Sequence, residues 1–455
     1  ELNTVRIANG QAFWGDSPAA PVAQVRGGDI DYLTLDYLAE ITMSVLRKQY
    51  ERDPDAGYAR DFVDLMSEIM QECIERDIKV VANAGGVNPQ GCAQALLDVA
   101  ASKGISGLRV GVVTGDDIMA QLDDLESEGV PLQNLDTGTS FDEVRDRIAS
   151  ANAYLGAEPI ARALADGANV VITGRCTDPG LVLGPLVHEF GWQWDDWDLL
   201  AAGTVAGHTI ECGAQASGGN FQGGWRTMDD LAHVGYPIVE VSAEGTFVVT
   251  KHPGTGGAVT TATVTEQLLY ELGDPATYLS PEVTADFTAL QVQEVGPDRV
   301  EVTGARGRPP TDSLKVSMAY PDGFQGAAMI TYAWPDAIAK AELADSVLRT
   351  RLKDLGLPLR AIRTDLVGYN SVHGRVVPPA GSDQSEVVLR VSIWADDPDT
   401  VSRFAAEIAP LVMGPPGFTG LLAGGRMRPS RVMAYWPTLV PKSVVDPQVI
   451  VRDGV

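Results

Sequence analysis

Short apolar runs alternate with amphipathic stretches through the first half of the chain, and this alternation limits its fold more than any other feature. Runs typical of buried strands occupy residues 4–10, 30–38, 78–86, 108–115 and 168–174. Stretches with helical spacing of apolar residues occupy 39–50, 62–77, 88–104, 116–129 and 158–167. Strands that alternate with helices in this way form βαβ units with parallel strands. The sequence therefore predicts an α/β fold with a mainly parallel sheet covered by helices.

The pattern changes after about residue 230. Paired strands are expected at 237–242 and 246–250, and a hairpin at 290–307. Later strands are interrupted by helical stretches at 336–353 and 400–413. Because 455 residues exceed one ordinary core, two domains are expected. We predict an α/β domain over 1–230 and an α+β domain over 231–455, with a ferredoxin-like arrangement as the candidate for the second.

The charge balance of the chain argues against polyanionic partners. The chain has 61 acidic and 34 basic residues, a formal net charge of -27. This sign opposes the backbone of a nucleic acid and an anionic membrane surface, so neither partner is expected. No apolar run approaches the ~20 residues that a membrane helix needs. A phosphate-bearing ligand such as coenzyme A stays compatible, because a helix N-terminus can bind it.

The four cysteines lie far apart and form no CxxC pair. A secreted disulfide scaffold or a zinc ribbon would have closer and denser cysteines. The first residues also lack the basic and apolar segments of a signal peptide. We therefore expect a cytoplasmic protein with free thiols.

Polar and glycine-rich segments follow several of the expected strands, notably at residues 83–89 and 174–180. In parallel sheets, ligands bind beyond the carboxyl ends of the strands. Neither segment contains a GxGxxG or GxxxxGK[ST] motif, so a nucleotide enzyme of those classes is not expected. The absence of a nicotinamide or flavin fingerprint likewise predicts no redox cofactor.

The segment "AGHTIECGAQASGGNF", residues 206–221, combines a base, an acid and a thiol. On a helix, His208 and Glu211 share a face, so the carboxylate would orient the imidazole as a general base. Cys212 points about 100 degrees away on the same helix. The alternative is a packed cysteine and a histidine that caps the helix end.

Donors for an oxyanion follow directly in this segment. Gln215 and Asn220 carry side-chain amides, and Gly218 and Gly219 would expose backbone N–H groups. Such donors stabilise the negative oxygen that forms when a proton leaves the carbon next to a carbonyl.

The segment "GRCTDPG", residues 174–180, offers a second set of groups. Arg175 could bind a carboxylate, Cys176 could react, and Asp178 could act as a base. The alternative is structural, because Asp178 and the proline after it also mark the start of a helix.

The segment 83–89 is a third candidate. Asn83 follows a strand, Gly85 and Gly86 allow close backbone approach, and Asn88 precedes a helix whose N-terminus could bind an anion. A tight turn between strand and helix explains the same residues.

The segment "KHPGTGG", residues 251–257, is the fourth. Lys251 and His252 precede Gly254, and the backbone there could form an anion-binding nest. An ordinary β-turn is the alternative. His208, Glu211 and Asp178 are possible metal ligands by residue type, but no ligand motif supports a metal site, and no metal is expected.

The sequence resembles the acyclic terpene utilisation proteins of the AtuA type. Six blocks carry the resemblance, at residues 5–16, 28–43, 80–89, 174–192, 201–221 and 252–283. The resemblance implies a cytoplasmic role in the breakdown of acyclic terpenoids or branched acids, with coenzyme A thioesters as the candidate form. Many relatives carry a further small C-terminal domain of ferredoxin-like type, and we expect this chain to end before it.

Together these features predict a catabolic enzyme of hydratase or lyase type that moves a proton next to a carbonyl. No cofactor is expected, and coenzyme A would enter only as part of the substrate. The expected partners are a small-molecule substrate and, as a candidate, further copies of the chain in a homo-oligomer. The alternative is a non-catalytic protein that binds an acyl-coenzyme A for a partner carboxylase.

Overall fold

The computed structural model describes residues 4–378, 384–414, 416–417, 420–421 and 427–454. Contacts between Cα atoms divide the chain into two compact units. The first contains Glu1–Ala319 and Tyr435–Val455, and the second contains Tyr320–Ala434. The chain leaves the first unit within strand β14 (Ser313–Ala333) and returns within β18 (Ser430–Pro441).

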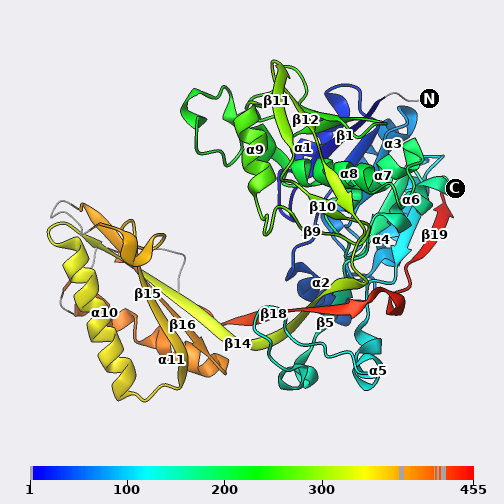
Figure 1. Cartoon of the computed structure of the whole chain (residues 1–455). Coiled ribbons are helices and arrows are strands. Elements are labelled where there is room, and N and C mark those ends of the chain that lie inside the picture. The colour runs from blue at the N-terminus through cyan, green and yellow to red at the C-terminus, as the bar shows by residue number, and fades with distance from the viewer. Residues whose placement is uncertain (1–3, 379–383, 415, 418–419, 422–426, 455) are drawn as a thin grey trace. The chain divides into compact units, whose positions relative to one another are not determined.

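The first unit is built on a sheet in which ten strands are described, in the order β11-β12-β8-β7-β1-β2-β3-β6-β4-β19. Figure 1 labels β1, β11, β12 and β19 of this sheet. These strands are β1 (Thr4–Gln11), β2 (Tyr32–Leu35), β3 (Lys79–Ala82), β4 (Arg109–Thr114), β6 (Val170–Thr173), β7 (Ile238–Ser242), β8 (Phe247–Thr250), β11 (Gln291–Gly296), β12 (Arg299–Thr303) and β19 (Gln448–Asp453). The central strands from β1 to β4 in this order run parallel. The α/β prediction is confirmed for this centre.

The sheet as a whole is mixed, so the expectation of a mainly parallel sheet is correct only at its centre. β7 pairs antiparallel with β1, and β8, β12 and β11 continue the antiparallel part. β19 adds an antiparallel strand at the opposite edge. Short connections explain two of the antiparallel pairs, β7 with β8 and β11 with β12, because strands joined by tight turns must run antiparallel.

Helices cover the sheet and bury its central strands. They are α1 (Ala19–Arg26), α2 (Thr42–Arg52), α3 (Arg60–Glu75), α4 (Pro89–Lys103), α5 (Leu122–Ser127), α6 (Glu158–Ala165), α7 (Gly180–Phe190), α8 (Trp197–Ile210) and α9 (Thr261–Leu269). Every residue of β2 and β6 is buried, as expected for parallel strands with both faces covered. Phe62 and Met66 of α3 and Leu96 of α4 pack in one core with Leu33 and Ile172 of these strands.

The boundary predicted near residue 230 lies inside the first unit. Four strands that follow it, β7, β8, β11 and β12, are hydrogen-bonded into the same sheet as β1. Smaller elements complete this unit: β5 (Ser150–Ala153) pairs with the start of β14, and a separate small sheet contains β9 (Tyr278–Leu279), β10 (Thr284–Asp286) and β13 (Arg306–Arg308).

The second unit has the element order of a ferredoxin-like fold. After β14 come α10 (Ala337–Asp354), β15 (Leu359–Val367), β16 (Glu386–Ala395), α11 (Pro398–Ala406) and β17 (Gly420–Leu421). The strands lie in the order β15-β16-β14-β17 with antiparallel pairing. This is the βαββαβ pattern. Tyr332, Leu348, Leu389 and Phe404 pack between the sheet and its helices.

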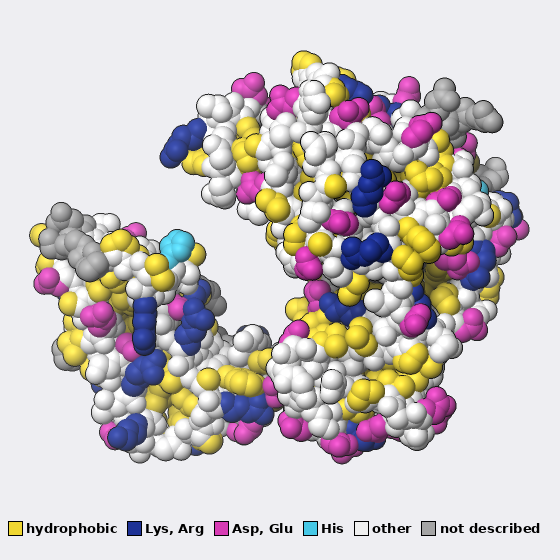
Figure 2. All heavy atoms as spheres, in the orientation of Figure 1, with side chains coloured by type: hydrophobic (Ala, Val, Ile, Leu, Met, Phe, Trp, Pro, Cys, Tyr) yellow, Lys and Arg dark blue, Asp and Glu magenta, His cyan; other side chains and the backbone are white. Residues whose placement is uncertain are grey.

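Charged side chains of both signs lie on the face of the protein shown in Figure 2. Figure 2 shows acidic, basic and apolar side chains interspersed on one face, so the net charge of -27 is not concentrated there in a single acidic field. Within the described ranges, no helix is long and apolar enough to span a membrane.

Candidate active site

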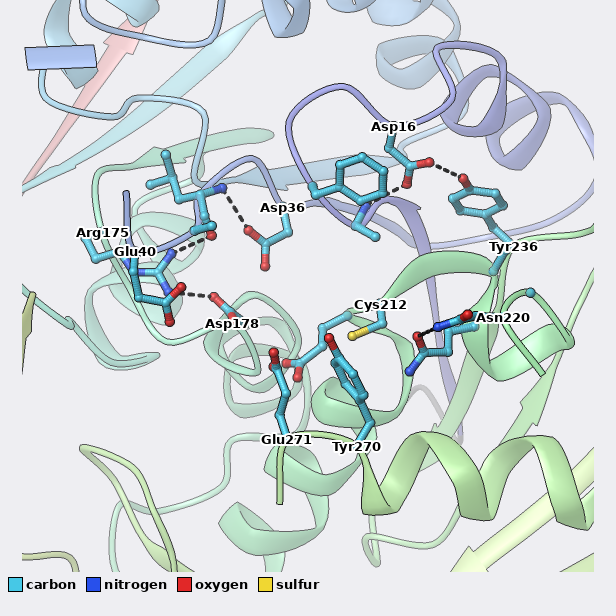
Figure 3. Close-up of a pocket in the computed structure, with 18 residues that line it drawn as sticks. Asp16, Asp36, Glu40, Arg175, Asp178, Cys212, Asn220, Tyr236, Tyr270 and Glu271 are labelled. Atoms are coloured by element: carbon cyan, nitrogen blue, oxygen red, sulfur yellow. Dashed lines mark hydrogen bonds and ion pairs between the residues drawn. The ribbon is translucent and has the colours of Figure 1, made fainter. Parts of the chain in front are cut away.

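A cavity of about 550 Å³ lies in the first unit, beyond the carboxyl ends of the parallel strands. Its volume is within the range of small-molecule sites. Loops after β1, β2 and β6 and the ends of α8 and α9 supply its walls. The carboxyl groups among the lining residues are those of Asp16, Asp36, Glu40, Asp178, Glu211 and Glu271. Figure 3 shows Asp36, Asp178 and Glu271 pointing into the same space, with Arg175 beside Asp178.

Glu211 follows the last turn of α8 and faces this cavity, whereas His208 lies behind it. The Nδ1 atom of His208 is 2.9 Å from Oε1 of Glu211, and its Nε2 atom is 3.3 Å from the carbonyl oxygen of Leu268. His208 is only 1% exposed, and the rings of Tyr278 and Phe287 pack edge-on against it. The predicted pair is therefore formed, but its carboxyl group faces the cavity and its imidazole does not line it.

The other carboxyl oxygen of Glu211, Oε2, is buried and has no hydrogen-bond partner among the described residues. Burial raises the pKa of Glu211 to about 7, although the charge and hydrogen bond of His208 act to lower it. For His208, burial lowers the pKa, but the charge and hydrogen bond of Glu211, the carbonyl of Leu268 and the charge of Glu271 together leave its pKa above the ordinary value. The pair therefore holds a proton near neutral pH.

Cys212 also lines the cavity. Burial raises the pKa of its thiol to about 12, and the charge of Glu211 acts in the same direction. The thiolate is the nucleophilic form of cysteine. At neutral pH, Cys212 is therefore a neutral thiol in this environment.

The amide groups predicted as oxyanion donors bond to one another. Nε2 of Gln215 donates to Oε1 of Gln267 at 2.7 Å, and Nδ2 of Asn220 donates to Oε1 of Gln215 at 3.3 Å. The N–H groups of Gly218 and Gly219 donate to carbonyl oxygens of their own turn. Each side-chain amide keeps one N–H for a ligand, because an NH₂ group has two. The two glycine N–H groups are already used.

Arg175 lies at the wall of the cavity in a fixed orientation. Its Nη1 atom donates to the carbonyl oxygen of Leu38 at 2.7 Å, and its Nη2 atom donates to Asp178 at 3.2 Å. The guanidinium carbon lies 4.3 Å from the centre of the Tyr154 ring. Its Nε atom is buried and has no partner within the described part of the chain. The Nε–H of Arg175 is thus a buried donor that no described residue satisfies.

Cys176 lies outside the cavity lining, although it follows Arg175 directly. It is 1% exposed and accepts a hydrogen bond from Oγ1 of Thr173 at 3.4 Å. Burial raises the pKa of this thiol to about 12. This geometry favours packing over reaction for Cys176.

Asn83 contacts the site through Asp36. Its Nδ2 atom donates to Oδ1 of Asp36 at 2.6 Å, and its Oδ1 atom accepts from the N–H of Tyr37 at 2.7 Å. Burial and the charge of Asp178 raise the pKa of Asp36 well above its ordinary value, although the charge of Arg175 opposes them. Asn83 therefore positions a cavity carboxyl group and does not itself line the cavity.

The rest of the segment 83–89 has structural contacts. Asn88 caps α4 by accepting from the N–H of Gly91 at 3.0 Å, and its Nδ2 atom donates to two carbonyl oxygens. A Cβ atom on Gly85 would lie 2.6 Å from the carbonyl oxygen of Thr173, and Gly86 has a φ of +55°. These glycines allow a tight turn from strand to helix.

The segment 251–257 does not line this cavity. Lys251 donates to the carbonyl oxygen of Thr255 at 2.7 Å and pairs with Asp298 at 3.3 Å. The Nε2 atom of His252 is 2.9 Å from the carbonyl oxygen of Gln24. Gly254 has a φ of +78° and lies in the turn that follows His252. In this arrangement Lys251 and His252 both have partners away from the cavity.

Several lining residues were missed in the sequence. Asp16 accepts a hydrogen bond from Tyr236 at 2.6 Å, and Tyr270 and Glu271 enter from the end of α9. Asp36 lies just beyond β2, but the run 30–38 reads as one uninterrupted strand. The presence of an acidic residue, Asp36, inside this apolar run was the sequence signal that could have marked it as a site residue. Among the described residues, no three His, Cys, Asp or Glu side chains are arranged to hold a metal ion.

Comparison with known protein families identifies the chain. The family described as acyclic terpene utilisation family protein AtuA matches residues 5–451. The chain belongs to this family. The resemblance seen in the six blocks is confirmed and extends over almost the whole sequence. Membership of the AtuA family implies a role in acyclic terpene utilisation.

Other comparisons add little to this family assignment. None of the curated proteins matches the chain. A crystal structure of a homoserine dehydrogenase from Thiobacillus denitrificans aligns over 92% of this chain and 84% of its own, with 11% identity and a TM-score of 0.15. This similarity is too low to support a shared fold.

Proposed function

We propose that this AtuA family protein is a catabolic enzyme that moves a proton at the carbon next to the carbonyl of an acyclic terpenoid or branched-chain acyl substrate. The observation that carries the proposal is Glu211. One of its oxygens is oriented by His208, the other is unpartnered in the described residues, and burial raises its pKa to about 7. A general base works best with a pKa near the operating pH.

In the proposed step, the Glu211 carboxylate takes the proton, and the carbon–hydrogen bond breaks. The electron pair moves toward the carbonyl oxygen, which becomes an enolate oxygen. Donors in a site of this kind stabilise such an oxygen strongly, and the free Nε–H of Arg175 is the charged donor of this cavity. The enolate then expels a hydroxyl group from the neighbouring carbon, which leaves as water with the proton from Glu211 and gives a carbon–carbon double bond. In the reverse direction, water adds to that carbon of an unsaturated acyl group and Glu211 returns a proton to the carbon next to the carbonyl. His208 acts as a positioning residue, because it holds Glu211 from behind.

The charge of the cavity limits how a coenzyme A thioester would bind. The lining contains six carboxyl groups and the single guanidinium of Arg175. Phosphate groups would be repelled by ionised carboxylates at this range. If the substrate is a coenzyme A thioester, its acyl end enters the cavity and its nucleotide end stays outside. We expect such an enzyme to act in the cytoplasm.

Hydrogen exchange tests the proposal directly. The protein is incubated in D₂O with thioesters of branched acyl groups, and the products are analysed by mass spectrometry. Abstraction and return of the proton would exchange hydrogen for deuterium at the carbon next to the carbonyl, and hydration of a 2,3-unsaturated thioester would add one water. Tight binding without exchange or hydration would contradict the enzyme proposal and favour the non-catalytic acyl-binding alternative.

A further inference from the structure

A second cavity, of about 650 Å³, adjoins the first within the same unit. The two share three lining residues, Glu40, Arg175 and Asp178. Loops before β5 and after α9, together with β9, β14 and β18, supply the remaining walls. The two cavities therefore meet at the guanidinium of Arg175.

The wall of the second cavity carries exposed apolar side chains from three separate parts of the chain. Leu135 is 44% exposed, Leu279 is 59% exposed and Leu439 is 43% exposed. Single exposed leucines are ordinary on protein surfaces, but several gathered on one concave wall mark a binding site. A ligand that covers them with an apolar group gains the free energy of removing that surface from water.

The polar groups of Arg175, where the two cavities meet, indicate which end of a ligand could bind at this point. The Arg175 side chain is 3% exposed, and its Nε–H has no partner among the described residues. A buried donor without a partner is costly, so a carbonyl oxygen placed there would be stabilising. The contacts of its Nη atoms with Leu38 and Asp178 and the ring of Tyr154 fix the plane of the guanidinium.

The charges that line the second cavity indicate which chemical class of ligand it could bind. Its lining contains the carboxyl groups of Glu40, Asp136, Asp178 and Asp274 against the cationic Arg175 and Lys315. This balance does not favour a phosphate or another strongly anionic group. An uncharged chain fits both the leucines and the charges.

We propose that the second cavity is the binding subsite for an uncharged, branched aliphatic chain, whose carbonyl end lies at Arg175 between the two cavities. The chain rests on Leu135, Leu279 and Leu439, and the carbon next to the carbonyl lies toward the first cavity. The direction of the substrate rests on the proposed function. The proposal that the second cavity binds an aliphatic chain concerns binding alone and does not depend on the proposed reaction.

Binding of two uncharged probes tests this subsite. The probes are the N-acetylcysteamine thioesters of 3,7-dimethyloctanoic acid and of 3-methylbutanoic acid, which differ in chain length. Binding to the full chain is measured by calorimetry in the Glu211→Gln background, which prevents turnover. We expect the longer probe to bind at least about tenfold more tightly, since each buried methylene adds to affinity.

Replacement of the exposed leucines should remove this preference. In the double variant Leu279→Gln and Leu439→Gln, the ratio of the two affinities should fall below about threefold. Ile450→Gln is the matched control, because Ile450 is 52% exposed on β19 and lines neither cavity. A melting curve for each variant checks that the fold is kept, and Leu135→Gln provides a third variant on a different loop.

The outcomes separate this inference from the proposed function. A chain-length preference that survives in the folded double variant, or no binding of the longer probe, would overturn the subsite. Loss of the preference supports the subsite even if the parent protein turns over neither thioester, a result that would count against the proposed function alone. Turnover of the thioesters with an unchanged preference in the double variant would leave the proposed function and reject the subsite.

Discussion

Oε1 of Glu211 lies 2.9 Å from Nδ1 of His208, while Oε2 of the same carboxyl group is buried and has no partner among the described residues. One side chain thus has an anchored oxygen and a free one. An exposed copy of the same spacing exists at Asp230 and His233, which lie 2.8 Å apart and line neither cavity. The two pairs provide a matched comparison.

Glu211→Gln should lower the rate of exchange or hydration about 100- to 10,000-fold, which is the usual loss for a general base. The amide keeps the size of the carboxyl group but cannot take the proton. Asp230→Asn should leave the rate unchanged, because it alters the exposed pair instead. Steady-state kinetics on the same thioester measure both, and equal rates for the two variants would reject Glu211 as the base.

The activity should rise with pH through about 7, because burial raises the pKa of Glu211 to about 7 and only the carboxylate is a base. His208 lowers this pKa by its charge and hydrogen bond. His208→Gln should therefore move the rise of kcat/KM to higher pH and leave part of the activity. An unchanged pH profile in this variant would show that His208 does not act through Glu211.

Cys212→Ser should retain most of the activity. Burial raises the pKa of the thiol to about 12, so the nucleophilic thiolate is scarce at neutral pH. Alkylation of this cysteine by iodoacetamide should also be slow at pH 7.5, as followed by mass spectrometry. A loss of more than about 100-fold in the serine variant would instead assign the thiol a direct role in the reaction.

Glu282 should make the protein less stable as the pH rises. Burial raises its pKa to about 7 in the folded state, whereas the ordinary value is 4.5. Between these values the unfolded chain loses its proton first, so the free energy of unfolding falls as the pH rises and levels off above pH 7. Glu282→Gln should reduce the loss of stability between pH 5 and pH 8 by about 2 kcal/mol. Urea unfolding at both pH values measures it, and an equal loss in parent and variant would contradict the role of this carboxyl group.

The local sequence predicts individual helices and strands of this fold, but it does not predict which distant strands pair. The helix predicted at 88–104 is α4, because Asn88 caps its start and Gly104 ends it with a φ of 65°. Nothing local indicates that β7 pairs with β1, since Ala8 and Ile238 are distant in the sequence. The sheet order beyond residue 230 therefore could not be predicted from periodicity.

The candidate site shows the same limit. The spacing of His208 and Glu211 predicts their contact, because a helix fixes it. It does not predict which of the two faces the cavity, since that depends on the packing of Tyr278 and Phe287 against the imidazole. Lys251 was a reasonable candidate by type, but its partner Asp298 comes from a distant hairpin.

The chain enters the second unit through β14 and leaves it through β18, and this connection bears on how the protein could diverge in evolution. These two strands pair with each other, and the 320–434 segment is enclosed between them. All the lining residues that the structure describes for both cavities lie outside that segment. The enclosed segment is thus an insertion that is joined to the first unit by two paired strands. Such an insert can diverge, shrink or be exchanged between relatives while the residues that meet the substrate are inherited unchanged.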